Sequence, residues 1–149
     1  MVFQCVQWTN TFSTNRDQFL KHSPYSLVYF YPKNDTPWCT KEAQDFTHLL
    51  ENFQTKNIQI IGISKDSLDK HCSFIEKYAL TPIYLSDPDL VLHKQFGAYW
   101  EKKSYWRIIQ WVIRSTFLLN QSGNILKERK NVKATWHAAR VWEYVENTL

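Results

Sequence analysis

Residues 29–46 read YFYPKNDTPWCTKEAQDF and contain a strand end, a turn and a helix start. The aromatic run ends at Pro32, and a polar turn leads to Thr36, Pro37 and Cys39. Thr36 suits the N-cap of a helix and Pro37 its first position, where the missing N–H costs nothing. Unpaired backbone N–H groups and the positive end of the helix dipole stabilise a negative sulfur in that first turn. The stretch therefore predicts that Cys39 is a nucleophilic thiolate.

A β–helix–β unit surrounds this turn. Residues 26–31 (SLVYFY) form a continuous apolar run, and Ile58–Ser64 (IQIIGIS) form a second one. Apolar residues between the two runs recur at helical spacing: Ala43, Phe46, Leu49, Leu50 and Phe53. Two buried strands joined by a helix are usually parallel, because the helix carries the chain back to the end where the first strand began. We therefore expect a parallel pair of central strands.

The rest of the chain continues to alternate helices and strands. The predicted elements after residue 64 are, in order, a helix from Asp66 or Ser67 to about Tyr78, a strand at 83–85, a helix at 90–96, a hairpin of residues 112–119 and 125–130, and a final helix. This pattern indicates an α/β protein with a thioredoxin-like fold, in which a central mixed sheet of about five strands has helices on both faces. The length fits a single domain of residues 1–149.

Composition and charge argue against several classes of protein. The chain has 18 Lys and Arg against 14 Asp and Glu, and a net charge of +4 is too small to indicate a nucleic-acid partner. No apolar run approaches the roughly 20 residues of a membrane span, and residues 1–10 lack the pattern of a secretory signal, so no membrane partner is expected. Three widely spaced cysteines suit a reducing compartment, which predicts a cytoplasmic protein. No Cys/His cluster has metal-binding spacing, so no metal site is expected.

The residues after Cys39 disfavour dithiol chemistry. A thioredoxin-type site has Cys-x-x-Cys after a tryptophan, and Trp38 does precede Cys39 here. The third residue after Cys39 is Glu42, however, so the turn offers no second thiol. Disulfide isomerase chemistry is therefore not expected at this helix.

The region around Cys39 resembles the Q-type peroxiredoxins, also called the bacterioferritin comigratory protein family. Their Pro-x-x-x-Thr-x-x-Cys motif is matched by Pro32, Thr36 and Cys39. Further segments resemble the family in the same order: IGISKDS at 61–67, YLSD at 84–87, QFGAYWEKKS at 95–104 and IRSTFLL at 113–119. The resemblance extends from about residue 25 to the C-terminus, and the agreement of several segments in order makes it specific.

The resemblance implies a role for each residue of the site. Cys39 would be the peroxidatic cysteine, whose thiolate attacks a hydroperoxide and becomes a sulfenic acid. Thr36 would hydrogen-bond the thiolate and the peroxide, and Pro32 would shield the sulfur from bulk water. Arg114 would keep the thiolate ionised and stabilise charge on the breaking O–O bond, and Glu42 would orient the arginine.

The same resemblance implies an activity. The protein would be a thiol peroxidase that reduces hydrogen peroxide and small organic hydroperoxides without a metal or prosthetic group. Its sulfenic acid would be recycled by an external thiol from thioredoxin, glutaredoxin or a small thiol, as in a thioredoxin-dependent peroxiredoxin. Q-type members are often monomeric, so a monomer or a weak homodimer is expected.

The resolving cysteine of the family is the main departure from its pattern. Many members carry it five residues after the peroxidatic cysteine, where this chain has Gln44. Another subset carries it on the next helix, at the position of Ile75, about one turn beyond Cys72. Cys72 is therefore a possible resolving cysteine, with inert packing as the alternative. Cys5 is the other candidate, and its place near a terminus favours an incidental cysteine.

Two further departures concern the pocket mouth and the N-terminus. Trp38 stands where the family often has glycine, and its bulk could change which hydroperoxides enter. Residues 1–24 lack the Ala-Pro-x-Phe segment with which members usually open, so we expect an atypical N-terminal segment.

Two alternative functions rest on other features of the chain. Gln44 and the atypical N-terminal segment would also suit a thioredoxin-fold binding module whose catalysis has decayed. Residues 99–111 (YWEKKSYWRIIQW) interleave cations with aromatic rings, a pattern that can stack single-stranded nucleic acid. For this segment we favour a loop that packs over the active site or at a protein contact, because its flanking residues resemble the enzyme family.

Overall fold

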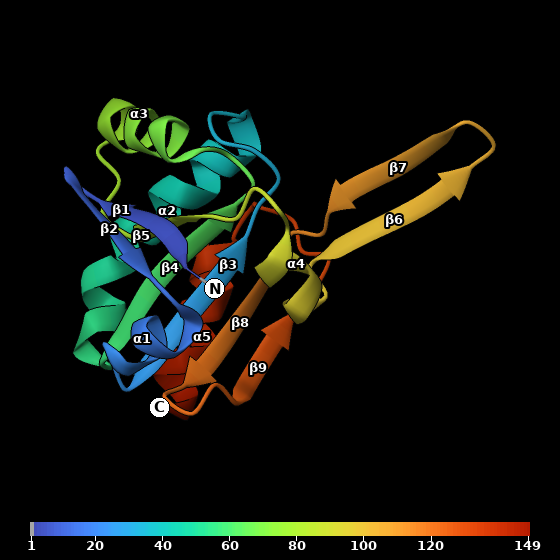
Figure 1. Ribbon diagram of the computed structural model, residues 1–149. Coiled ribbons are helices and arrows are strands. Elements are labelled where there is room, and N and C mark those ends of the chain that lie inside the picture. The colour runs from blue at the N-terminus through green and yellow to red at the C-terminus, as the bar shows by residue number, and fades with distance from the viewer. Residues whose placement is uncertain (1) are drawn as a thin grey trace.

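The computed structural model describes residues 2–149 and has a central seven-stranded sheet with helices on both faces (Figure 1). The strands of this sheet are β1 (Phe3–Gln7), β2 (Asn10–Thr14), β3 (Tyr25–Phe30), β4 (Ile58–Ser64), β5 (Ile83–Ser86), β8 (Ser115–Asn120) and β9 (Ile125–Arg129). A separate two-stranded sheet consists of β6 (Tyr99–Ser104) and β7 (Arg107–Val112). The helices are α1 (Arg16–Lys21), α2 (Pro37–Thr55), α3 (Leu68–Tyr78), α4 (Val91–Phe96) and α5 (His137–Thr148). The predicted α/β, thioredoxin-like architecture is confirmed.

The central sheet is mixed, and its spatial order is β2-β1-β5-β4-β3-β8-β9. β4 runs parallel to both β3 and β5, which confirms the expected parallel pair, whereas β8 and β1 join as antiparallel neighbours. The expected number of about five strands is wrong because residues 3–14 form the additional hairpin β1–β2. Its turn begins at Trp8, which has a φ of 56°, and it contains none of the Gly or Asn-Gly signals that mark most tight turns.

The two faces of the sheet carry separate apolar clusters. On β3, Leu27 and Tyr29 pack toward α2, α3 and α5, whereas Val28 and Phe30 pack toward α1 and α4. Successive residues of a strand point to opposite faces, and here both faces are covered by helices. This is why residues 27–31 are apolar and aromatic and show no alternation with polar residues.

The hairpin β6–β7 stands away from the body of the protein (Figure 1), and we call residues 99–112 the arm. Its two strands pair with each other from Tyr99–Val112 to Ser104–Arg107, and neither joins the seven-stranded sheet. The arm does not pack over the active site, one of the two placements expected for this segment. It also divides the strand predicted at 112–119, because Val112 ends β7 and β8 begins at Ser115.

Candidate active site

Cys39 lies in the first turn of α2, as the sequence predicts. Only 2% of the residue is exposed, and it belongs to the apolar cluster between the sheet and α2, α3 and α5. Arg114 Nη2 donates a hydrogen bond to Cys39 Sγ at 3.1 Å, although the two residues are 75 positions apart. The guanidinium of Arg114 and the positive end of the α2 dipole therefore both lie beside the sulfur of Cys39.

Arg114 lies just before β8, on the side of the sheet that faces α2 and α5. Leu118 belongs to the same cluster as Cys39, and Thr116 is in hydrogen-bond contact with His137 on α5. Residues two positions apart on a strand share a face, which places Arg114 on the same side of the sheet as Thr116 and Leu118.

Glu42 holds the other end of the Arg114 guanidinium. Arg114 Nη1 donates to Glu42 Oε1 at 2.6 Å, and the second carboxylate oxygen is buried with no partner among residues 2–149. Burial raises the pKa of Glu42 to about 7, and the attraction of Arg114 offsets this only in part. For Arg114, burial opposes the charge, but Glu42 and Cys39 together hold its pKa above the usual value. The guanidinium is therefore a permanent cation.

Thr36 occupies the N-cap position of α2, but its side chain makes no capping hydrogen bond. Its hydroxyl instead donates to the carbonyl oxygen of Lys33 at 3.2 Å. The predicted position is therefore correct and the predicted cap is wrong, so Thr36 leaves the N–H groups of Trp38 and Cys39 free of that interaction. Its oxygen also keeps the capacity to accept a hydrogen bond. Pro32 is half-buried in the same loop, between β3 and α2.

A buried polar network anchors this loop to the rest of the fold. The backbone N–H of Asn34 donates to Asp66 Oδ2 at 2.8 Å, and the Tyr31 hydroxyl donates to Asn34 Oδ1. Asn34 Nδ2 lies 2.9 Å from His71 Nδ1, and His71 Nε2 lies 3.2 Å from the carbonyl oxygen of Leu85. The partners come from separate segments, and no local motif in the sequence marks them as a group.

His71 takes part in this network as a neutral ring. Burial lowers the pKa of His71 to about 4. Because the carbonyl of Leu85 can only accept, the ring proton is on Nε2, and Nδ1 accepts from the amide of Asn34. Protonation of the ring would place a second N–H against that amide, so the network depends on the neutral form.

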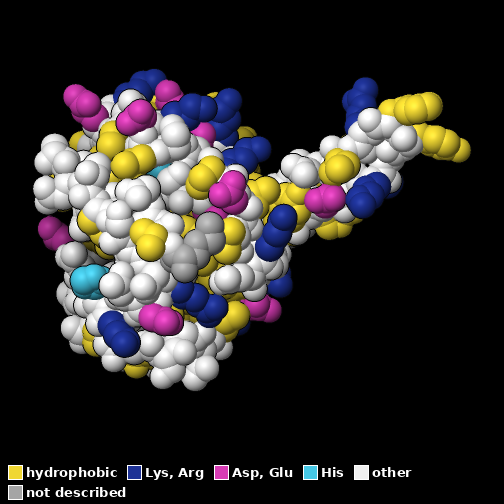
Figure 2. All heavy atoms as spheres, in the orientation of Figure 1, with side chains coloured by type: hydrophobic (Ala, Val, Ile, Leu, Met, Phe, Trp, Pro, Cys, Tyr) yellow, Lys and Arg dark blue, Asp and Glu magenta, His cyan; other side chains and the backbone are white. Residues whose placement is uncertain are grey.

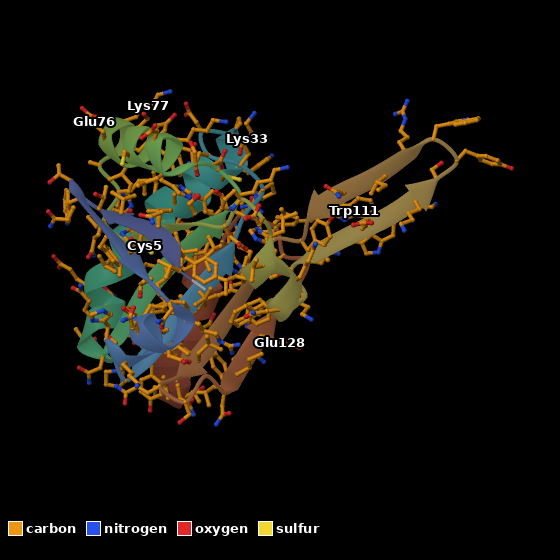
Figure 3. All side chains as sticks on the ribbon, viewed as in Figure 1. Cys5, Lys33, Glu76, Lys77, Trp111 and Glu128 are labelled. Carbon is orange, nitrogen blue, oxygen red and sulfur yellow. The ribbon has the colours of Figure 1, made fainter. Side chains whose placement is uncertain are left out.

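The three cysteines are free and lie in different surroundings. Cys72, on α3, is half-buried and packs against the cluster that contains Cys39. Cys5, on β1 (labelled in Figure 3), belongs to the cluster on the opposite face of the sheet, and burial raises its pKa to about 12. The sheet therefore separates Cys5 from Cys39, whereas Cys72 is on the same side.

A hollow of about 500 Å³ opens beside the site and is lined by Trp38, Arg114 and residues 133–135. A larger hollow of about 580 Å³ has Cys5 in its wall, but neither Cys39 nor Arg114 lines it. Of these two hollows, the smaller one reaches the guanidinium that contacts Cys39. Within residues 2–149, no group of three or more His, Cys, Asp or Glu side chains is arranged to hold a metal ion.

Comparison with known proteins gives relatives for most of the chain. The sequence pattern of the AhpC/TSA family matches residues 7–128. A Mycobacterium tuberculosis protein named as a peroxiredoxin is 44% identical over 115 residues, which are 77% of this chain and 73% of that protein. Peroxiredoxin Bcp of Bacillus subtilis is 37% identical over 123 residues, which are 83% of this chain and 78% of that protein.

The structural comparison agrees with these relatives. The bacterioferritin comigratory protein of Xanthomonas campestris, described for its alkyl peroxide reduction activity, is 29% identical and matches with a TM-score of 0.85. The match covers 99% of this chain and 90% of that one. Fold, site and relatives together define a thiol-dependent peroxidase. The chain belongs to the AhpC/TSA family, and the resemblance of its sequence to the Q-type peroxiredoxins is confirmed.

Proposed function

We propose that Cys39 is the peroxidatic cysteine of this enzyme. The observation that carries the proposal is the 3.1 Å contact between Arg114 Nη2 and Cys39 Sγ at the start of α2. The thiolate attacks one oxygen of the hydroperoxide, the S–O bond forms and the O–O bond breaks. Cys39 becomes a sulfenic acid, and the departing oxygen takes up a proton and leaves as water or an alcohol.

Arg114 stabilises the charge that moves during this step. In the ground state the charge is on Cys39 Sγ, and in the transition state it spreads over the two peroxide oxygens. A fixed cation at the site of developing charge lowers the barrier without reorganising solvent. Glu42 keeps the guanidinium in place through the 2.6 Å contact at Nη1, which leaves Nη2 for the sulfur and the substrate.

Thr36 and the helix N-terminus orient the hydroperoxide. The Thr36 oxygen accepts from the peroxide O–H, and the N–H groups of Trp38 and Cys39, which no Thr36 cap occupies, donate to its oxygens. Pro32 limits the access of bulk water to the sulfur. These roles are supported by the position of the four residues within one loop and one helix turn.

The proposed substrates are hydrogen peroxide and small organic hydroperoxides. The hollow beside Arg114 is open to solvent, and Trp38 on its wall is 62% exposed. An indole at the mouth suits a substrate with a short apolar group, as does the alkyl peroxide activity of the Xanthomonas relative.

We also propose that an external thiol reduces the sulfenic acid. Thioredoxin, glutaredoxin or a small thiol attacks the sulfenic sulfur and releases water, and a second thiol attacks the mixed disulfide and restores Cys39. Gln44 at the short-loop resolving position supports this route. We place this chemistry in the single domain of residues 1–149, acting in the cytoplasm as a monomer or weak homodimer.

Serine substitution of each cysteine tests the proposal. Cys39→Ser should abolish peroxide consumption, because an alcohol at this position does not form the nucleophilic anion at neutral pH. Cys72→Ser should retain turnover with an external thiol, and Cys5→Ser is the matched control. Unchanged peroxide consumption by Cys39→Ser would remove the peroxidatic role. Non-reducing peptide mapping after one equivalent of peroxide tests the recycling route, and a linked Cys39–Cys72 pair would contradict direct reduction by an external thiol.

A further inference from the structure

The arm is the part of the protein that peroxidase chemistry leaves unexplained. Figure 2 shows hydrophobic side chains gathered at its tip, with Lys and Arg side chains on the arm. The tip is the turn between β6 and β7, where Tyr105 and Trp106 are 97% and 94% exposed. Two-residue hairpin turns ordinarily use Asn, Asp or Gly, and two large aromatic side chains exposed side by side in such a turn indicate a contact with another surface.

The strands of the arm also expose apolar side chains to water. Ile108 and Ile109 are exposed, as are Trp100 and Trp111, which stack on each other near the base (Figure 3 labels Trp111). A lone two-stranded hairpin is only marginally stable in water. The arm therefore has the features of a binding element whose partner completes it.

The charge of the arm argues for an anionic partner. Residues 99–112 contain three basic residues, Lys102, Lys103 and Arg107, and one acidic residue, Glu101. Lysines on exposed edge strands oppose pairing between copies of a sheet, and like charges would face each other in an arm-to-arm dimer. A second copy of this chain is therefore a poor partner, whereas a negatively charged surface is complementary.

The side chains favour a lipid surface over a single-stranded nucleic acid. Base stacking needs open aromatic faces along the path of the strand. Trp100 and Trp111 lie with their ring centroids 3.6 Å apart, so each covers one face of the other. The neighbouring Ile108 and Ile109 have no faces on which bases could stack, but aliphatic and aromatic side chains both enter the interface of a bilayer.

We propose that the arm is a peripheral anchor for membranes with anionic phospholipids. Tyr105 and Trp106 enter the headgroup layer, and Lys103 and Arg107 beside them contact lipid phosphates. No helix within residues 2–149 is long and apolar enough to cross a membrane, and this contact requires none. The expectation that no membrane partner exists rests on spanning segments and secretory signals, and it does not address an aromatic hairpin of this kind.

Vesicle flotation tests the anchor directly and does not depend on peroxide turnover. The full-length protein is mixed with vesicles of phosphatidylcholine alone or of phosphatidylcholine with about 30% phosphatidylglycerol. Each mixture is tested at low and at high salt. We expect binding to the anionic vesicles, weakened at least several-fold by high salt and by omission of phosphatidylglycerol. Tyr105→Ser/Trp106→Ser and Lys102→Glu/Lys103→Glu should each reduce binding by about tenfold or more.

Matched control variants distinguish a role of the arm from the general effects of losing an exposed tryptophan or changing the net charge. Trp8→Ser removes an exposed tryptophan outside the arm, and Lys21→Glu/Lys70→Glu changes the net charge as much as the arm double variant does. Both controls should bind vesicles like the wild type. All variants should keep wild-type turnover of hydrogen peroxide, which shows that they are folded.

Several outcomes would overturn the anchor. Absence of binding to anionic vesicles would do so, as would unchanged binding by the Tyr105→Ser/Trp106→Ser variant. Arm-dependent binding to a single-stranded oligonucleotide without vesicle binding would assign the arm to nucleic acid instead. An arm-dependent dimer in sedimentation, again without vesicle binding, would assign it to a second copy of the chain.

Discussion

Arg114 connects the two acidic side chains of the site, Cys39 and Glu42. Its Nη2 contacts the sulfur of Cys39 and its Nη1 contacts the buried carboxylate of Glu42. The guanidinium can serve both because it presents several donors in one rigid plane, whereas the ammonium group of lysine is a single point charge on a flexible stem. The shape of the side chain, as well as its charge, therefore suits this position.

Replacement of Arg114 should slow the reaction of the thiol with peroxide. Arg114→Met removes the cation at the breaking O–O bond, and loss of one such group typically costs about 10²–10³ in rate. Arg114→Lys should lose less, because it keeps the charge but not both contacts. Stopped-flow mixing of reduced protein with hydrogen peroxide, followed by tryptophan fluorescence, measures the rate constant.

The exposed Arg140 on α5 provides the matched control for this series. Arg140→Met makes the same change in net charge and should react at close to the wild-type rate. If Arg114→Met also reacted at that rate, the assigned role of the guanidinium would be wrong.

Among the elements, α3 links the active-site loop to the sheet. His71 holds the loop through Asn34, and Cys72 is the next residue of the same helix. A displacement of α3 that carried Cys72 toward Cys39 would also shift His71 and disturb its contact with Asn34. This structural cost is a physical reason to favour an external thiol over Cys72 as the resolving group.

Loss of the His71 ring should loosen this loop. In His71→Leu the volume is nearly kept, but the amide of Asn34 and the carbonyl of Leu85 lose a buried partner, at a cost of about 2–4 kcal/mol in unfolding free energy. The peroxide rate constant should fall as well, because the loop carries Pro32 and Thr36. Urea unfolding and stopped-flow kinetics measure the two effects, with the exposed His48→Leu as control. Wild-type stability in His71→Leu would contradict the anchoring role.

For the complete chain, buried histidines make stability depend on pH. The pKa values of His71 and His137 are lowered from 6.5 to about 4 by burial, so the unfolded chain binds more protons between these values. Their contribution is fully present above pH 6.5 and is lost as the pH falls toward 4. With 1.36 kcal/mol for each unit of pKa, each histidine accounts for about 3 kcal/mol at most.

Glu42 works in the opposite direction and provides the check on this prediction. Its pKa is raised from 4.5 to about 7, so its contribution is fully present below pH 4.5 and is lost as the pH rises toward 7. In the wild type it therefore offsets part of the loss caused by the histidines. Glu42→Gln should show a steeper fall in unfolding free energy from pH 7 to pH 4.5, measured by urea titration with circular dichroism. If the unfolding free energy of the wild type and of Glu42→Gln changed equally with pH over this range, a raised pKa for Glu42 would be excluded.

The central β–helix–β unit could be predicted because its signals are local. The apolar run at 26–31, the proline after it and the helical spacing that follows Cys39 each arise from residues a few positions apart. The hairpin β1–β2 was missed because its turn at Trp8 lacks the residues that usually mark a turn. Its strands are short, and β1 depends on pairing with β5, a partner about 80 positions away in the chain at the pair Cys5 and Leu85.

The start of α2 and the place of Cys39 in its first turn follow from the order of the amino acids, because the geometry of Pro37 acts within one turn. The family resemblance added Arg114, but its contacts with Cys39 and Glu42 depend on how β8 and α2 pack across the sheet. The anchoring of Asn34 by His71 and the projection of the arm from the body were visible only in three dimensions. Contacts between distant residues are set by the packing of the complete chain, and the local spacing of residues does not predict them.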